Sequence, residues 1–562
     1  MDSVRLQRVL SAASAVVSAV IVGVMLVACT RGFDFTDEGY YVVSIADPGL
    51  YSAGATQFGF VYHPLFELLG SDIVRLRQAN VVLTFGLAWL LAYVLLRKLV
   101  DVRAQRLAIS AAVATASMMI FAIWVITPSY NSLALQGVMV TMLGVALVEE
   151  RWWAWALIGL GGVIALLAKP TTALALAALV LLCLFAMRTF RWRGALVVGA
   201  VAVGTLAACA LAIDGSLVEF WQRTADGADQ MKLLDARHDV SAAVRIDAIE
   251  PGERLLLLAL AFAGIVVAVA YARRLTAAVI VVALAAVAVL AVYGHVAEVL
   301  GTNPQRALLF LAIPAAALLV LDLRRAALAV TLLLLPLAYA FGSNGNYWQV
   351  GGSAAVLWVL AGVVAVGRRS LPALAAVGIV SQVAIVALLA AGDPYRQLDP
   401  LADQTIATGI GSSTIHLGPG VAAYVREASR VARDAGFEPG TPMIDLTGKS
   451  PGLLYALDAE PIGQAWMIGG YPGSDELAIE SLELSGCKDV STSWILTEFS
   501  GARSLSESVL VPFGATLADD YEVAGSWDTA PGVAGFADPV RQVLWRPTRS
   551  SQEALSACQS AS

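Results

Sequence analysis

The sequence contains little charge. Only 14% of its 562 residues are Asp, Glu, Lys or Arg, and 58% are apolar, whereas a soluble globular chain carries about 25% charged residues. The apolar residues come in blocks of about 20, the length that a helix needs to cross a lipid bilayer. The basic residues form no patch of the kind that binds nucleic acid. These features predict a polytopic α-helical membrane protein without a nucleic-acid partner.

Residues for metal and nucleotide chemistry are also scarce. The chain has four histidines and five cysteines, and none of them are spaced as in a zinc site. The segment Gly448–Gly452 (GKSPG) lacks the upstream glycine of a phosphate-binding loop. Cys487 and Cys558 lie in the polar tail, where they either form a disulfide or remain free thiols. The sequence therefore predicts no structural zinc and no P-loop.

Charge is nearly absent inside the apolar blocks as well. Ion-coupled transporters usually carry acidic or basic groups there, and inverted-repeat carriers contain paired helices broken by Gly or Pro. We find neither pattern. These absences argue against an ion-coupled transporter.

We predict about 13 transmembrane helices. Their approximate bounds are 9–30, 74–96, 107–127, 132–148, 153–168, 171–187, 194–213, 255–272, 275–294, 305–322, 326–341, 350–367 and 371–391. With a cytoplasmic N-terminus, every short loop on the cytoplasmic side is basic, as the positive-inside rule requires. The C-terminus is then outside the cytoplasm. We expect the first helix to be retained, although Leu26–Cys29 resembles a lipoprotein cleavage site.

The tail differs from the rest in charge. From Asp393 to the end there are 22 acidic and 10 basic residues, which indicates a domain boundary near Gly392. We expect a membrane domain at 1–392 and a small extracytoplasmic α/β domain at 393–562. Strands are predicted at 442–446, 493–499 and 541–547, and helices at 420–435 and 475–484. The glycine-rich GKSPGLLY and IGGYPGS segments either contact a substrate or form ordinary turns.

The polar stretch 31–72 between the first two spans is unusual for a connecting loop. It contains Asp37 and Glu38, followed by many aromatic residues and by His63. A carboxylate just above the bilayer can act as general base for an acceptor hydroxyl, and two of them can hold a divalent cation. A helix N-cap with solvated acids explains the same residues. The aromatic residues Tyr40, Tyr41 and Tyr62 are candidates for lining a substrate site.

Four cations stand near predicted outer helix ends, where a lipid phosphate would lie. They are His63, Arg75, Lys169 and Arg306. Lys169 follows an unbroken apolar run and precedes a proline, which favours a functional role, whereas the two arginines could simply reach the lipid headgroups. Polar positions that could hydrogen-bond a sugar are Tyr130, Asn131 and Asn303.

The first polar stretch resembles a motif of the GT-C glycosyltransferases, in the branch of the lipid A aminoarabinose transferases and protein O-mannosyltransferases. The resemblance is carried by Asp37-Glu38-Gly39-Tyr40-Tyr41, Tyr62-His63-Pro64-Leu65, Gly70 and Arg75-Leu76. It implies that Asp37 is the catalytic base and that the donor is a polyprenyl-phosphate sugar. The family lysine that contacts the donor phosphate falls at or beside Tyr62, so His63 would take its place. Relatives often carry a second acid where this chain has Tyr130 and Asn131.

The sequence thus predicts an inverting glycosyltransferase, transferring a hexose or a pentose, in the plasma (inner) membrane. Its donor is a polyprenyl-phosphate-linked sugar and its acceptor is a lipid, a glycan or a protein of the cell envelope. A divalent cation at Asp37 and Glu38 is left open, because no second ligand set is present. The alternatives are a transporter of lipid-linked glycans and a non-catalytic envelope-assembly protein.

Overall fold

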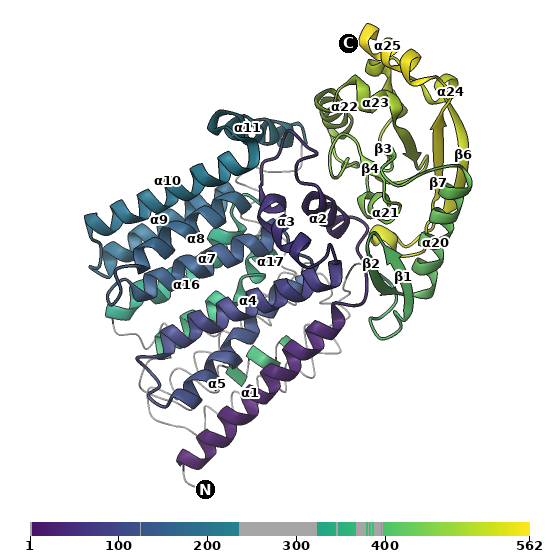
Figure 1. Ribbon diagram of the computed structural model, residues 1–562. Helices are drawn as coiled ribbons and strands as arrows, with labels where there is room; N and C mark the ends of the chain where they lie inside the picture. The colour runs from purple at the N-terminus through teal and green to yellow at the C-terminus, as the bar shows by residue number, and fades with distance from the viewer. Residues whose placement is uncertain are drawn as a thin grey trace, which may run out of the picture.

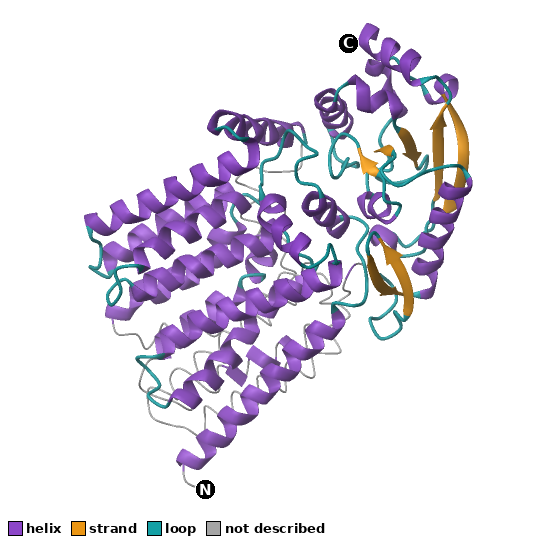
Figure 2. Cartoon of the chain, in the orientation of Figure 1, coloured by secondary structure: helices purple, strands orange, loops and turns teal. Residues whose placement is uncertain are grey.

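The computed structural model describes residues 3–123, 125–234, 323–343, 347–366 and 397–561, with a few isolated positions between 378 and 395. A body of long helices is joined to a C-terminal region (residues 397–561) that contains all the described strands (Figures 1 and 2). The arrangement confirms the predicted class, a helical body of several long apolar helices followed by a region with a sheet.

The long apolar helices lie alongside one another in the helical body (Figure 1). They are α1 (Ser3–Ala28), α4 (Ile73–Leu96), α5 (Arg103–Ala114), α7 (Tyr130–Leu147), α8 (Ala154–Ala168), α9 (Pro170–Ala186), α10 (Trp192–Asp214), α16 (Leu323–Ala340) and α18 (Ala355–Val366). Within the described residues, five helical segments are long and apolar enough to cross a membrane. The predicted spans at 255–272, 275–294 and 305–322, and most of 371–391, lie outside the described residues. The number thirteen stays a prediction.

Two of the predicted spans are composite. The span at 107–127 consists of α5, a 3₁₀ turn η1 (Thr115–Met118) and α6 (Met119–Ile123), and the span at 350–367 consists of the end of the short helix α17 (Tyr347–Gly352) and of α18. Helices α7 and α8 pack closely because Gly137 and Gly161 face each other. A Cβ atom at Gly137 would lie 2.9 Å from the Gly161 carbonyl oxygen, so a larger side chain would separate the helices.

The stretch 31–72 is not an open loop. It folds into α2 (Asp37–Ala46) and α3 (Phe58–Leu68), which lie at the end of the helical body that faces the C-terminal region (Figure 1). Asp37 and Glu38 occupy the first turn of α2, where the helix dipole favours negative charge. Helix α11 (Leu217–Leu233), which follows α10, lies across that same end (Figure 1).

The C-terminal region contains a five-stranded sheet in the order β4-β3-β5-β7-β6. The strands are β3 (Pro442–Asp445), β4 (Glu460–Pro461), β5 (Trp494–Thr497), β6 (Tyr521–Asp528) and β7 (Arg541–Pro547). Strand β3 pairs in parallel with β4 and β5, whereas β7 runs antiparallel to β5 and β6. The predicted strands and helices correspond to β3, β5, β7, α20 (Pro419–Asp434) and α22 (Ser474–Ser485), whereas β6 and the hairpin of β1 (Ile406–Ile410) and β2 (Ser413–Leu417) were not predicted.

The C-terminal region rests directly on α2 through α21 (Pro451–Ala456). The Gly452 amide donates a hydrogen bond to the Phe35 carbonyl oxygen (2.9 Å). A Cβ atom on Gly39 would collide with the backbone of Gly452, and one on Gly452 would lie 2.7 Å from Phe33 and Phe35. Glycine at both positions therefore lets the two backbones touch and fixes the C-terminal region above the start of α2.

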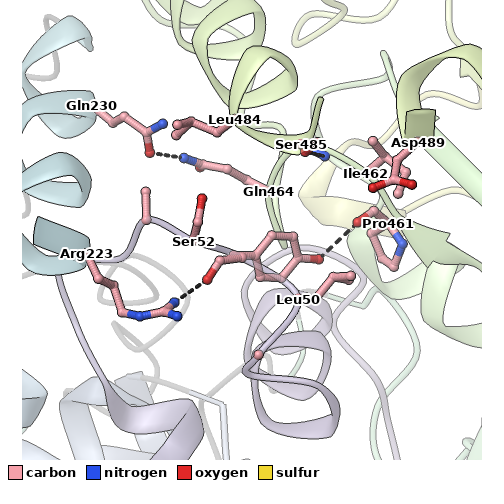
Figure 3. Close-up of a pocket in the computed structure, with 14 residues that line it drawn as sticks. Leu50, Ser52, Arg223, Gln230, Pro461, Ile462, Gln464, Leu484, Ser485 and Asp489 are labelled. Carbon is pink, nitrogen blue, oxygen red and sulfur yellow. Dashed lines mark hydrogen bonds between the residues drawn. The ribbon is translucent and has the colours of Figure 1, made fainter. Parts of the chain in front are cut away.

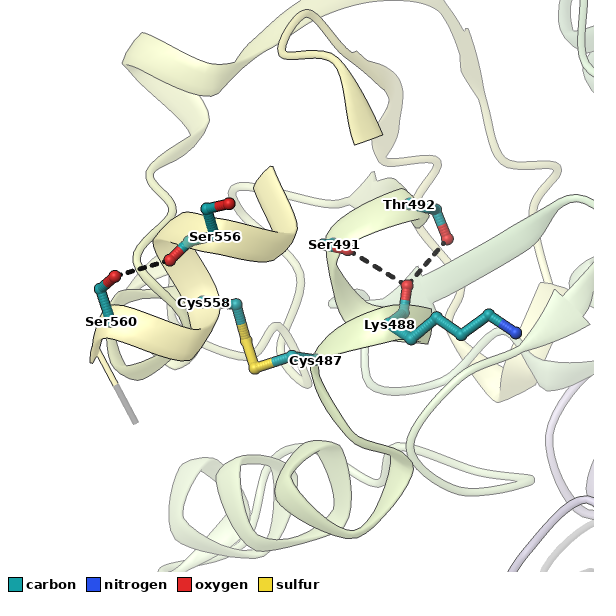
Figure 4. The surroundings of a disulfide bond; sticks show 7 residues. All are labelled: Cys487, Lys488, Ser491, Thr492, Ser556, Cys558 and Ser560. Atoms are coloured by element: carbon teal, nitrogen blue, oxygen red, sulfur yellow. Dashed lines mark hydrogen bonds between the residues drawn. A yellow bond between two sulfur atoms is a disulfide. The ribbon is translucent and has the colours of Figure 1, made fainter. Parts of the chain in front are cut away.

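A disulfide joins Cys487 and Cys558, with a Cα–Cα distance of 5.7 Å (Figure 4). It ties α23 (Cys487–Thr492) to the last helix, α25 (Ser551–Ala561). Of the two alternatives that the sequence left open for these cysteines, the structure has the bonded one.

Candidate functional site

Glu38 and Arg77 form a buried ion pair at the base of α2. The Glu38 Oε1 and Arg77 Nη2 atoms are 2.7 Å apart, and both side chains are fully buried. Thr127 also donates a hydrogen bond to Glu38 Oε1. Arg77 donates further hydrogen bonds to the carbonyl oxygens of Cys29 and Gly32, at 2.8 Å each. The pair therefore fastens the start of α2 to α4 and to the end of α1.

Arg75 was a predicted phosphate contact, whereas Arg77 was not among the predicted site residues. Arg75 is exposed and donates to the Leu69 carbonyl oxygen (3.2 Å), whereas Arg77 shares a buried face of α4 with Asn80 and Thr84. These positions are spaced three and four residues apart, as on one helix face. That spacing was visible in the sequence and would have identified Arg77.

Asp37 is half-buried at the first position of α2. Its carboxylate lies close enough to Tyr40 and Tyr41 to affect both hydroxyls. Burial is the main reason why the pKa of each hydroxyl is raised, and the negative charge of Asp37 raises it further. Asp37 therefore lies beside the aromatic side chains rather than in the ion pair of its neighbour.

Four rings form what we call the aromatic cluster: Tyr40, Tyr41, Phe58 and Tyr130. The Tyr41 ring centroid lies 5.5 Å from that of Tyr40 and 5.8 Å from that of Tyr130. Phe58 packs against the three tyrosines at 5.8–6.0 Å. Most of these contacts are edge-to-face, the arrangement that aromatic quadrupoles favour. The cluster joins α2 and α3 to the start of α7.

Lys169 lies over the Tyr130 ring of the aromatic cluster. It is the single residue between α8 and α9, is only 7% exposed, and has its Nζ atom 5.7 Å from the Tyr130 ring centroid. The ammonium donates to Ser343 Oγ (2.6 Å) and, at 3.5 Å, to Asn131 Oδ1. Among the described residues it forms no ion pair with a carboxylate. Burial lowers the pKa of Lys169 to about 8.

The other predicted residues lie elsewhere. His63 donates from Nδ1 to the Ile45 carbonyl oxygen (2.8 Å) and so links α3 to α2. Tyr62 is buried and donates to Gln136 Oε1 (3.0 Å), within the polar contacts between α4 and α7. Arg306 and Asn303 lie outside the described residues. The structure thus brings Asp37, Tyr40, Tyr41, Tyr130, Asn131 and Lys169 together, but not Arg75, His63 or Tyr62.

A pocket of about 200 Å³ opens between the 49–53 segment, α11 and the C-terminal region (Figure 3). Gln464 donates to Gln230 Oε1 across it (2.6 Å). Its one arginine, Arg223, is paired with Asp214 at 2.7 Å. The side chains that line the pocket therefore already join the 49–53 segment, α11 and the C-terminal region to one another. None of the predicted site residues lines the pocket.

Metal ligands are not clustered in the described part of the chain. No three side chains of His, Cys, Asp or Glu come close enough there to hold an ion. Glu38, one of the two acids considered for a cation, is instead held by Arg77 and Thr127.

Comparison with known proteins gives structural neighbours only. No family model and no curated protein matches the chain. The crystal structure of ArnT from Cupriavidus metallidurans bound to undecaprenyl phosphate is similar, with a TM-score of 0.41 and 14% identity over 94% of this chain and 97% of that chain. The apo crystal structure of the same protein gives a TM-score of 0.38 and 12% identity at the same coverage. ArnT is a lipid A aminoarabinose transferase, of the branch that the motif around Asp37 resembles.

Proposed function

We propose that this protein is an inverting glycosyltransferase that moves a sugar from a polyprenyl-phosphate donor to a cell-envelope acceptor at the outer face of the membrane. The observation that carries the proposal is that Asp37 and Lys169 both lie near the aromatic cluster. Asp37 is close enough to Tyr40 and Tyr41 for its charge to raise the pKa of both hydroxyls, and the Lys169 ammonium lies over the Tyr130 ring. One site thus offers a base and a phosphate-binding cation, the two groups that transfer from a lipid phosphate requires.

In the proposed reaction, the acceptor hydroxyl gives its proton to an Asp37 carboxylate oxygen while its own oxygen attacks the anomeric carbon. The bond from that carbon to the phosphate oxygen breaks, and the lipid phosphate leaves with the electron pair. A single displacement inverts the anomeric carbon. No nucleotide is needed because the lipid phosphate is already an activated leaving group. The donor sugar is a hexose or a pentose.

Lys169 stabilises the phosphate as charge develops on it. Its two hydrogen-bond partners, Ser343 and Asn131, are neutral. A buried ammonium usually has an anionic partner, and a lipid phosphate would supply one. His63, Arg75 and Arg306 were the other predicted phosphate contacts. His63 and Arg75 are held by the carbonyl oxygens of Ile45 and Leu69, and Arg306, which lies outside the described residues, stays a prediction.

Glu38 has a different task from Asp37 in this proposal. Its carboxylate is occupied by Arg77 and Thr127, so it positions α2 and does not take the proton. Glu38→Gln would leave Arg77 buried without a counter-charge and should reduce the amount of folded protein.

The proposed orientation places residues 393–562 outside the cytoplasm as a domain of their own, above a membrane domain at 1–392. The disulfide between Cys487 and Cys558 supports it, since disulfides persist in oxidising compartments. A reporter fused after Gly392 should therefore be extracytoplasmic.

The proposal is tested by single-turnover transfer from a polyprenyl-phosphate sugar in detergent. Asp37→Asn is nearly isosteric but removes the base, so we expect wild-type expression and donor binding with transfer about 10²–10⁴-fold slower. Asp47→Asn, an exposed acid at the end of the same helix, is the matched control and should transfer normally. Near-wild-type transfer by Asp37→Asn would remove Asp37 from the chemistry and leave it as a helix-capping acid.

A further inference from the structure

The line of aromatic contacts continues from Tyr40 into the C-terminal region. The ring centroids of Tyr40 and Trp466 are 6.3 Å apart. The Arg503 guanidinium lies 5.7 Å from the ring centroids of both Trp466 and Tyr471. Tyr40 stands three residues after Asp37, on the same face of α2. A continuous series of side chains thus joins the proposed base to Arg503.

The segment that presents Arg503 is held rigidly. A Cβ atom on either Gly448 or Gly469 would collide with the Arg503 carbonyl oxygen. The segment starts at Glu498, which is buried and pairs with Lys449 at 2.6 Å. It ends where the Leu505 amide donates to the Leu446 carbonyl oxygen (2.9 Å). The backbone that carries Arg503 is therefore fixed before any ligand arrives.

One nitrogen of the Arg503 guanidinium lacks an acceptor. Its Nη1 atom is buried and has no hydrogen-bond partner among the described residues. A buried donor without a hydrogen-bond partner costs free energy, and such donors are rare in native structures. The oxygen of a bound anion would satisfy it, because the guanidinium fork matches a carboxylate or a phosphate group.

We propose that Arg503 binds an anionic group of the acceptor, a phosphate or a carboxylate, while the adjacent sugar ring lies against Trp466 and Tyr471. This inference rests on the proposed function. Lys169 stands at the other end of this series of side chains, at the junction of α8 and α9, and binds the donor phosphate. Arg503 comes from the C-terminal region, so it serves the second substrate. The acceptor is then an acidic glycan or a phosphate-bearing one.

The test measures binding of three disaccharide probes to the full-length protein in detergent: cellobiose, cellobiouronic acid and cellobiose 1-phosphate. Titration calorimetry is run on wild type, Arg503→Gln, Arg503→Lys and the control Arg546→Gln, which alters an exposed arginine paired with Glu522. A charge-assisted contact corresponds to roughly 10- to 100-fold in affinity. We expect Arg503→Gln to lose that factor for at least one charged probe, Arg503→Lys to recover part of it, and the control to match wild type. The charged probe that binds more tightly identifies the acidic group.

Undecaprenyl phosphate binding, measured in parallel, separates this inference from the proposed function. It should be unchanged in Arg503→Gln. If Arg503→Gln weakens the lipid as much as the sugars, Arg503 belongs to the donor phosphate and the inference is wrong. Equal binding of charged and neutral probes to wild type also overturns it. Failure of wild type to bind the lipid would instead contradict the proposed function.

Discussion

Two lysines of this chain are buried against aromatic rings, but their surroundings differ. Lys449, in the C-terminal region, lies 4.2 Å from the Phe536 ring centroid and 2.6 Å from the Glu498 carboxylate. Lys169, at the end of the helical body, lies over Tyr130 and Tyr339, and its hydrogen-bond partners among the described residues are a hydroxyl and an amide.

The difference separates a structural cation from one that is available to a ligand. A buried charge is tolerated when an opposite charge pairs with it, and Lys449 has that partner within the protein itself. Among the described residues Lys169 has no carboxylate partner, and a bound anion would supply the opposite charge. A buried lysine whose partners are neutral is therefore better evidence for a phosphate site than any surface cation, such as the exposed Arg75.

The largest expected effect is on the paired lysine. Glu498→Gln leaves Lys449 buried without its counter-charge, and breaking such a pair costs about 3–5 kcal/mol. We expect the urea midpoint of the full-length protein, followed by tryptophan fluorescence, to fall accordingly. Glu522→Gln, at an exposed pair with Arg546, should change it by less than about 1 kcal/mol.

A double variant, Lys449→Met with Glu498→Leu, should recover most of the stability, because well-packed apolar residues can replace a buried pair. If Glu498→Gln is as stable as wild type, the ion pair does not stabilise the buried Lys449, and Lys449 is not the structural cation of the comparison with Lys169.

The second effect has the opposite sign. Lys169→Met removes a buried charge that has no anionic partner among the residues that the structure describes, so the ligand-free protein should become more stable by roughly 1–3 kcal/mol at pH 7. The lowered pKa of Lys169 gives the matching pH dependence. Wild type should gain stability as the pH rises through about 8, because the unfolded chain then binds the proton more tightly than the folded one. Lys169→Met should not show this gain in thermal unfolding.

The smallest effect concerns ligand affinity and pH. Only the protonated lysine attracts the lipid phosphate, whose own second ionisation is nearly complete by pH 7. Because the pKa of Lys169 is lowered to about 8, binding of undecaprenyl phosphate should weaken roughly tenfold from pH 7 to pH 9. Lys169→Arg stays charged and should bind equally at both values. A constant affinity in wild type would mean that Lys169 does not contact the phosphate.

Much of the architecture could be predicted because it depends on local pattern. Long apolar runs predicted the helices, and β-branched and aromatic residues predicted β3, β5 and β7. Strand β6 was missed because its register shifts between Val523 and Gly525, which interrupts the alternation of side chains. A helix that starts at Asp37 was only one of two alternatives, and α3 was missed, because Gly39 and Pro64 disfavour helix locally. Contacts from distant segments stabilise both helices.

The candidate site could be predicted only in part. Asp37 and Lys169 were recognised from their positions beside apolar runs. The separate roles of Asp37 and Glu38 could not be derived, because they depend on Arg77, which is 39 residues from Glu38 in the chain. Arg503 is farther still from Tyr40, and no local pattern connects the two.

We propose that a lipid phosphate is the anionic partner of Lys169. A titration with undecaprenyl phosphate, monitored by thermal unfolding, tests this most directly. Lipid should raise the melting temperature of wild type and of Lys98→Met, which alters an exposed lysine paired with Glu149. In Lys169→Met we expect affinity to fall roughly 10- to 100-fold and the lipid-induced stabilisation to fall with it. The same stabilisation in Lys169→Met as in wild type would contradict the account.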